Sequence, residues 1–198
     1  MKMNENVRKE LKQWAILAII ALALYLTGLH TEVIGLMQRG LLATGLIRPH
    51  IELTSQETTE NLPAINLDVS LLSDQGQSLN LQQLQGKVLL INFWATWCPP
   101  CLAEMPNVDR LYRDLKGEDI QFILISTDQD FSKAVDFIQK KGYQVPIFHL
   151  QSYLPEGLNS NTLPTTYVIN KQGKVVFEHR GMAQYNTNKF KAFLRGLL

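Results

Sequence analysis

The stretch that decides the fold runs Lys87-Val-Leu-Leu-Ile-Asn-Phe-Trp-Ala-Thr-Trp-Cys-Pro-Pro-Cys101. Its first half is a nearly continuous apolar run with β-branched and aromatic residues, which is typical of a strand buried on both faces. Beyond the cysteines, apolar side chains recur at helical spacing, which predicts an amphipathic helix that ends near Gly117. Pro106 falls inside that helix and is expected to kink it. Cys98 and Cys101 therefore lie where a buried strand turns into a helix.

These two cysteines are the only ones in the chain. The free amides and the positive dipole end of a helix N-terminus stabilise a thiolate, which is the nucleophile in disulfide exchange. Cys98 is therefore the candidate attacking thiol. Cys101 lies one turn into the helix, is expected to be more buried, and can reach back to resolve a mixed disulfide. A Cys-x-x-Cys pair inside a strand–helix–strand pattern indicates a redox motif, so both are candidate catalytic residues.

Two other uses of the cysteine pair are weaker. A zinc site would need two more ligands at metal-binding spacing. The histidines are scattered, at His30, His50, His149 and His179. A purely structural disulfide would close a loop of four residues, which constrains the unfolded chain little. We expect no metal and no cofactor.

Periodicity over residues 62–198 predicts an α/β domain. A hairpin pattern with a Gly-containing turn precedes the central strand, over residues 67–81. The cysteine helix is followed by a buried strand (120–126), a helix (131–142), a short strand (145–150), a hairpin (165–179) and a terminal amphipathic helix (190–197). This order describes a central mixed sheet flanked by helices, with an N-terminal β-hairpin extension.

Length and composition limit the classes of function. The chain has 198 residues, 45% of them hydrophobic, and a net charge of +1. Nucleic-acid binders show a basic face, so near-neutral charge argues against one. Two cysteines cannot build the disulfide framework of a small secreted domain. Residues 50–198 carry 13 Lys or Arg and 15 Asp or Glu, a net charge of −2 that gives no bias toward anionic lipid.

The front of the chain differs from the rest. No charged residue occurs from Gln13 to Thr31, a length just sufficient for a helix to cross a bilayer. The excess of Lys and Arg in residues 1–13 predicts a cytoplasmic N-terminus, one transmembrane signal anchor over residues 14–30, and a domain outside the membrane. A cleaved signal peptide and a buried core helix are the alternatives. The first lacks a good cleavage site, and the second lacks a polar face.

Residues 31–61 are predicted to be an interfacial segment followed by a linker. Their apolar part is short and carries Gln38 and Arg39 near its middle, which does not suit a second membrane span. A hairpin that re-enters the membrane is the alternative. The part from His50 to Asn61 is polar and has no periodicity, as expected of a linker.

Three separated motifs carry a resemblance to a known family. Residues 88–106, Leu163-Pro164-Thr-Thr-Tyr-Val-Ile-Asn170 and the hairpin from Gly173 to Gly181 resemble, in the same order, motifs of membrane-anchored thioredoxin-like proteins of the TlpA type. The resemblance covers roughly residues 62–198. It implies a thioredoxin-like fold and periplasmic thiol–disulfide exchange at the inner membrane, often linked to cytochrome c maturation.

The resemblance also implies roles for single residues. Cys98 resembles the attacking thiol of the family and Cys101 its resolving thiol. Pro164 resembles a cis-proline that faces the cysteine pair, with Leu163 beside a bound substrate strand; a strand-leading proline is the alternative. Trp97 is expected at the rim, and it joins Leu163 and Pro164 as a candidate substrate-binding residue.

Glu104 matches an acidic residue of the same family, three positions after Cys101. That spacing returns to the same helix face, so Glu104 could accept a proton from Cys101 and is the third candidate catalytic residue. The alternative is a solvated acid of the first turn, favoured there by the helix dipole. Asn92 departs from cytosolic thioredoxins, which carry a buried acid at this position. The role of that acid is missing here or has moved to Glu104.

The residues around the pair favour reduction of substrates. Pro99 and Pro100 lack the amides that could hydrogen-bond a Cys98 thiolate, and an ionised Glu104 would disfavour it further. The expected partners are oxidised protein thiols, such as apocytochrome c, and a membrane thiol-electron donor. A membrane-tethered chaperone-like binding module and a thiol peroxidase are the alternatives. The peroxidase is disfavoured because such enzymes carry a single reactive Cys in a P-x-x-x-T-x-x-C pattern, whereas Cys98 follows Ala95-Thr96-Trp97 and is paired with Cys101.

Overall fold

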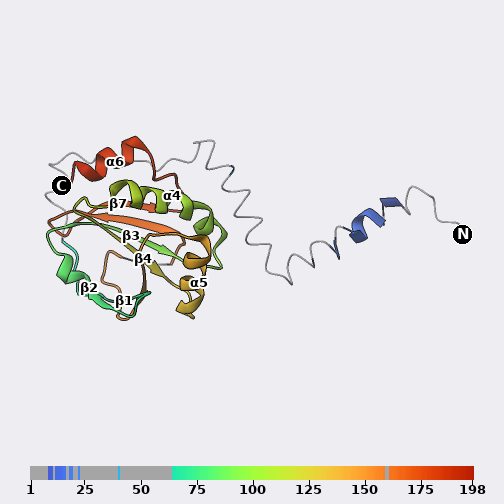
Figure 1. Ribbon diagram of the computed structural model, residues 1–198, viewed down its shortest axis with the longest axis horizontal. Helices are drawn as coiled ribbons and strands as arrows, with labels where there is room; N and C mark the ends of the chain where they lie inside the picture. The colour runs from blue at the N-terminus through green and yellow to red at the C-terminus, as the bar shows by residue number, and fades with distance from the viewer. Residues whose placement is uncertain are drawn as a thin grey trace, which may run out of the picture.

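A seven-stranded sheet forms the centre of the domain in the computed structural model (Figure 1). The structure describes residues 64–158 and 161–198, together with residues 9–10, 12–16, 18–19, 22 and 40. The strands are β1 (Ser70–Ser73), β2 (Ser78–Asn80), β3 (Val88–Trp94), β4 (Ile120–Ser126), β5 (Ile147–Leu150), β6 (Thr165–Ile169) and β7 (Val175–Arg180). The helices are the 3₁₀ turn η1 (Leu81–Leu84), α4 (Pro99–Leu115), α5 (Phe131–Lys141) and α6 (Asn188–Arg195).

The strand order is β2-β1-β5-β4-β3-β6-β7. β3, β4 and β5 run parallel to one another, as expected of strands joined through helices. β6 lies antiparallel to β3 on its other side, and β7 and the β1–β2 hairpin complete the two edges. The mixed sheet and the N-terminal hairpin predicted from the sequence are confirmed.

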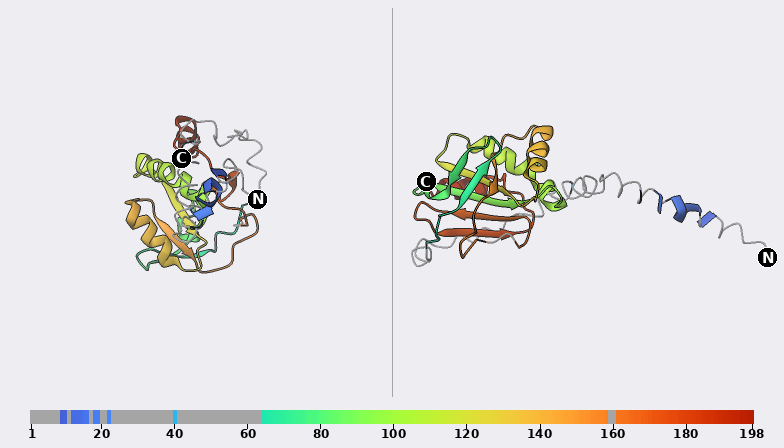
Figure 2. Two further views of the ribbon diagram at one scale, coloured as in Figure 1. Left: turned by 90° about the vertical axis from the view of Figure 1, so that its right-hand side faces the viewer. Right: turned by 90° about the horizontal axis from the view of Figure 1, so that it is seen from below.

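Alternate residues of the central strands point to opposite faces and divide the core in two. On one face α4, α5 and α6 pack over the sheet as a layer, which the end-on view shows (Figure 2). On the other face η1, residues 65–69 and the connection from β5 to β6 cover the sheet. Leu89, Ile91 and Phe93 are at most 1% exposed there, although no α-helix of the described residues packs on them.

The boundaries of the elements differ from the predicted ones in one instructive place. A strand was expected from Val145, whereas β5 begins at Ile147. The Val145 amide donates instead to the Asp109 carboxylate of α4 at 3.1 Å, and Pro146 has no amide to pair. The chain is thus fixed to α4 before it enters the sheet. The predicted helix stop at Gly142 is confirmed, with φ of 67° in the left-handed region.

The predicted cytoplasmic N-terminus (1–13), anchor (14–30) and interfacial segment with linker (31–61) lie largely outside the described residues and stay predictions. Among the residues that the structure describes, no helix is long and apolar enough to cross a membrane. The described part of the anchor region is helical, and its Trp14 and Ile19 side chains are 69% and 65% exposed.

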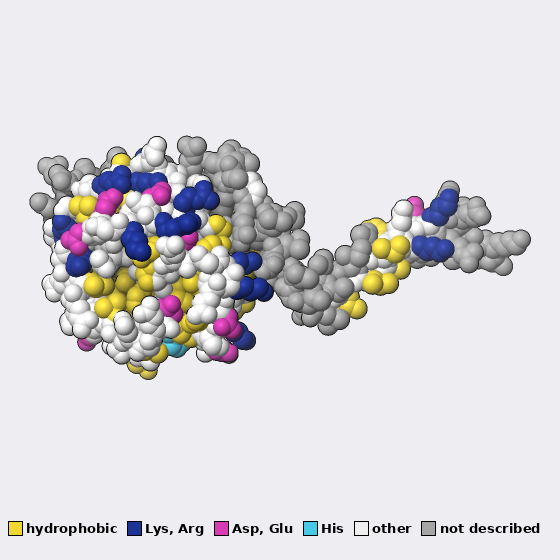
Figure 3. Space-filling view, in the orientation of Figure 1, with side chains coloured by type: hydrophobic (Ala, Val, Ile, Leu, Met, Phe, Trp, Pro, Cys, Tyr) yellow, Lys and Arg dark blue, Asp and Glu magenta, His cyan; other side chains and the backbone are white. Residues whose placement is uncertain are grey.

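Charged side chains of both signs lie over the helices α4 and α6. Lys and Arg predominate over α4 and α6 in the space-filling view, with Asp and Glu between them (Figure 3). Two ion pairs link α4 and the turn that follows it to α6: Lys191 with Asp114, and Arg195 with Glu118. Surface pairs of this kind contribute little stability each, so the buried cores hold the fold.

Candidate active site

Cys98 and Cys101 form a disulfide at the N-terminus of α4, with their Cα atoms 5.3 Å apart. Cys98 is the N-cap residue and follows the C-terminal end of the central strand β3, while Cys101 lies in the first turn. Cys98 is 4% exposed and Cys101 is fully buried, so the Cys98 sulfur is the one nearer to solvent. The burial follows the predicted order; the attacking and resolving roles stay predictions.

The first turn of α4 still offers one amide to the sulfur. Pro99 and Pro100 occupy its first two positions and have no N–H. The Cys101 amide donates to Cys98 Sγ at 3.3 Å, as in an N-cap. The two prolines therefore weaken the hydrogen bonding of the Cys98 sulfur without abolishing it.

The start of β6 places Leu163 and Pro164 beside the cysteine pair. β6 is antiparallel to β3, which sets Thr165 opposite Phe93, close to the end of β3 that leads to Cys98. The Leu163–Pro164 peptide bond is cis, as the resemblance implied. The Pro164 carbonyl accepts a hydrogen bond from the Gly181 amide at 2.8 Å, which ties this turn to the end of β7.

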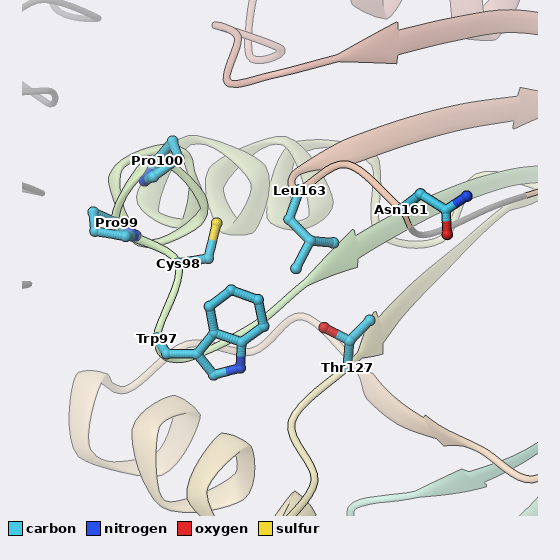
Figure 4. A pocket seen from close by; sticks show the side chains of 7 residues that line it. All are labelled: Trp97, Cys98, Pro99, Pro100, Thr127, Asn161 and Leu163. Atoms are coloured by element: carbon cyan, nitrogen blue, oxygen red, sulfur yellow. The ribbon is translucent and has the colours of Figure 1, made fainter.

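An open groove of about 530 Å³ lies over the disulfide (Figure 4). Its lining comes from three loops: Trp97, Cys98, Pro99, Pro100, Thr127, Asn161 and Leu163. None of these side chains is charged. Trp97 is 61% exposed, so its ring forms a rim available to a ligand, as predicted. An apolar surface with few polar groups, open along one side, suits an uncharged extended peptide segment.

Glu104 is buried rather than solvated. Its side chain is 1% exposed and lies under the loop that follows β7. Asn92 Nδ2 donates to Oε1 at 2.9 Å, and the Ala183 amide donates to Oε2 at 3.1 Å. Burial raises the pKa of Glu104 to about 8, against the lowering effect of these two hydrogen bonds. The alternative of a solvated first-turn acid is wrong, because the 181–187 loop covers this face of α4.

The raised pKa also changes the expected charge of the site. At pH 7 a carboxyl with a pKa of about 8 is mostly protonated and neutral. Glu104 therefore adds little negative charge near Cys98 at that pH. It is instead a proton donor and acceptor whose affinity lies close to that of a thiol, which is about 8.5.

A buried polar network fixes Glu104 between the sheet and the loop. Asn92 Nδ2 also donates to Thr166 Oγ1 at 2.9 Å, which links β3 to β6. Asn107, one turn beyond Glu104 in α4, donates to the Ala183 carbonyl at 3.3 Å and accepts from the Asn186 amide at 3.0 Å. The Glu104 carboxyl is thus fixed by elements far apart in the sequence. Within the described part of the chain, no cluster of His, Cys, Asp and Glu could hold a metal ion.

The family assignment comes from comparison of the whole domain with known proteins. A family model described as Redoxin matches residues 57–193. The chain belongs to the Redoxin family. The resemblance to the TlpA type is narrower than this assignment and stays a prediction.

Curated relatives that the chain resembles in sequence are thiol-disulfide oxidoreductases. ResA of Halalkalibacterium halodurans is 31% identical over 128 residues, which are 61% of this chain and 70% of the relative. ResA of Bacillus subtilis is 29% identical over 102 residues, 51% of this chain and 57% of that one. The chain therefore spans little more than half of the Bacillus subtilis protein. The enzyme class predicted from the sequence, thiol:disulfide oxidoreductase, is confirmed.

The thioredoxin-like fold is confirmed by a solved structure. A thiol:disulfide interchange protein of the thioredoxin family from Chlorobium tepidum superimposes with a TM-score of 0.54 at 21% sequence identity. The match covers 69% of this chain and 94% of that one. At this identity the likeness concerns the fold alone.

Several residues of this Redoxin-family site were missed by the sequence analysis. Thr127 and Asn161 line the groove but lie 29 and 63 positions after Cys98, in loops without a local motif. Ala183 and Thr166 hold the Glu104 network through contacts that no sequence spacing reports. The one usable signal was that Thr127 directly follows a buried strand parallel to β3, so both strand ends meet at one edge.

Proposed function

We propose that this enzyme reduces disulfides of exported proteins at the outer face of the cytoplasmic membrane. The buried Glu104, one turn behind Cys101 and with a pKa of about 8, is the observation that carries the proposal. A carboxyl so matched to a thiol can take the Cys101 proton when that thiol must become a nucleophile. A disulfide with a purely structural role needs no such group.

The proposed reaction proceeds in two exchanges. The Cys98 thiolate attacks a substrate disulfide, which forms a mixed disulfide and releases one substrate thiolate. In the fraction of enzyme whose Glu104 is ionised, Cys101 then passes its proton to this carboxylate and attacks Cys98 Sγ, which releases the second substrate thiolate. The enzyme ends as the Cys98–Cys101 disulfide seen in the structure. Two electrons have passed to the substrate, and a second dithiol must return the enzyme to its reduced form.

The groove supports an uncharged segment around the substrate cysteine. Trp97 and Leu163 offer apolar surface in the groove (Figure 4). We expect the backbone before Pro164 to run beside an extended substrate chain. Oxidised protein thiols, with apocytochrome c among them, are the proposed substrates. The proposed electron donor is a membrane protein that carries thiol equivalents outward, and the predicted anchor over residues 14–30 would keep the domain beside it.

The direction of exchange follows from weak stabilisation of the Cys98 thiolate, because stabilising a thiolate makes a pair more oxidising. In the first turn of α4 the Cys101 amide donates to the sulfur, whereas Pro99 and Pro100 have no amide to offer. We expect a potential nearer about −270 mV than about −120 mV in a glutathione or dithiothreitol titration. A potential above about −180 mV would contradict the reductive function.

A trapping experiment tests the substrate and donor. Cys101→Ala in intact cells should accumulate mixed disulfides through Cys98, released by dithiothreitol and identified by mass spectrometry. Cys98→Ala is the matched control and should trap nothing. Insulin reduction should exceed peroxide consumption. The absence of both activities in the wild type would favour the binding module instead. Recovery of only cytoplasmic partners would contradict the proposed location.

A further inference from the structure

Another buried carboxylate, Asp128, lies beside the active-site loop and has no part in the exchange described above. Its side chain is 3% exposed and follows the C-terminal end of β4. Among the described residues, no Lys or Arg forms an ion pair with it. A buried charge without a charged partner is rare and requires hydrogen bonds to be stable.

The hydrogen bonds of Asp128 go to the segment that precedes Cys98. The Thr96 amide donates to its Oδ2 at 3.0 Å, and Thr96 Oγ1 donates to its Oδ1 at 2.6 Å. Ser126 Oγ donates to Oδ2 at 2.8 Å. The carboxylate acts as an acceptor in all of these bonds, and two of the three donors belong to one residue of the active-site loop.

The loop after β3 and the loop after β4 are also joined by a second set of hydrogen bonds. The Thr127 amide donates to the Trp94 carbonyl at 2.8 Å, and Thr127 Oγ1 donates to the same atom at 3.2 Å. The Cys98 amide donates to the Ala95 carbonyl at 3.3 Å, so Thr96 lies inside the turn that carries the sulfur. The close-up shows Trp97 and Thr127, one from each loop, beside the same groove (Figure 4).

We propose that Asp128 is a positioning residue that sets both the place of Cys98 and the reducing character of the pair. Its hydrogen bonds to Thr96 hold the turn that presents the sulfur and the Trp97 rim. Its negative charge lies in a buried setting where screening is weak, and it disfavours the Cys98 thiolate. The inference deepens the proposed reductive function and rests on it.

The test measures the thiol–disulfide equilibrium of the purified domain with glutathione at pH 7. Asp128→Asn retains an acceptor for the Thr96 amide and removes the charge. We expect its equilibrium to shift about three- to tenfold toward the reduced dithiol, because the Cys98 thiolate becomes more stable. An unchanged equilibrium, or a shift toward the disulfide, would overturn the electrostatic part of the proposal.

Asp109→Asn is the matched control. Asp109 is also a buried aspartate, but its carboxylate binds the Gln144 and Val145 amides and pairs with Arg113. Its substitution should lower the melting temperature and leave the glutathione equilibrium unchanged. An equal shift in both variants would show a general effect of destabilisation and overturn the assignment to Asp128.

Thr96→Val tests the positioning part and serves if Asp128→Asn does not fold. It keeps the charge and removes only the hydroxyl bond to Asp128. We expect the rate of insulin reduction to fall about three- to tenfold with the equilibrium within about twofold of the wild type. An unchanged rate would overturn the positioning role. A wild-type potential in the oxidising range would refute the proposed reductive function, whereas the shift between wild type and Asp128→Asn is measured independently of it.

Discussion

At the residue scale, Glu104 shows how burial converts an ordinary acid into a group suited to thiol chemistry. The same carboxyl at the surface would be ionised at pH 7 and would not exchange protons with a thiol. Under the loop that contains Ala183, the carboxyl keeps two hydrogen bonds but loses its hydration. The loss of hydration raises its pKa more than the two hydrogen bonds lower it. Spacing along α4 predicted its side of the helix but not this environment.

Glu104 should make the oxidised protein less stable as the pH rises. A group whose pKa is higher in the folded than in the unfolded protein stabilises the fold at pH values below its unfolded pKa. This stabilisation is lost as the pH rises through the folded pKa. Between about pH 4.5 and 8, the free energy of unfolding of the wild type should therefore fall by roughly 3–5 kcal/mol relative to Glu104→Gln. Urea unfolding of both proteins from pH 4 to 9 measures this difference.

Glu118→Gln is the control for that measurement. Arg195 lowers the pKa of Glu118, so its contribution changes only at more acidic pH. Its stability difference from the wild type should stay level across pH 5 to 9. A level difference for Glu104→Gln as well would show that the pKa of Glu104 is not raised in the folded protein, so that its carboxylate would be too weak a base to take a proton from a thiol.

At the element scale, the first turn of α4 sets how well a Cys98 thiolate is stabilised. Pro100→Ala restores an amide at the second helical position, where an N-cap side chain ordinarily finds a partner. We expect the glutathione equilibrium to shift about three- to tenfold toward the reduced dithiol. The measurement is quantification of reduced and oxidised protein after equilibration in glutathione buffers.

Pro106→Ala provides the comparison within the same helix. It also adds an amide, but in the interior of α4, away from the sulfur. It should leave the redox equilibrium unchanged. If Pro106→Ala shifts the equilibrium as far as Pro100→Ala, the effect belongs to helix stability and not to the amide near Cys98.

At the scale of the whole molecule, the buried residues of one core begin at Leu67 and those of the other at Val88. Residues 62–198 expressed alone should therefore fold and reduce insulin with kcat/KM within about twofold of the full chain. The full chain should fractionate with membranes and the shorter form should not, if residues 14–30 are an anchor. Fractionation of the full chain with soluble proteins would contradict that proposal.

The sequence by itself determined the kind and order of the elements and the place of the cysteine pair. These depend on local signals: an apolar run for β3, helical spacing after Cys101, and a proline motif before β6. Tertiary structure alone decided what surrounds the pair. Glu104 meets Asn92 and Ala183, and Thr96 meets Asp128, because strand order and loop crossing bring distant segments to one sheet edge. Burial and its effect on pKa depend on those contacts, which no spacing along the chain specifies.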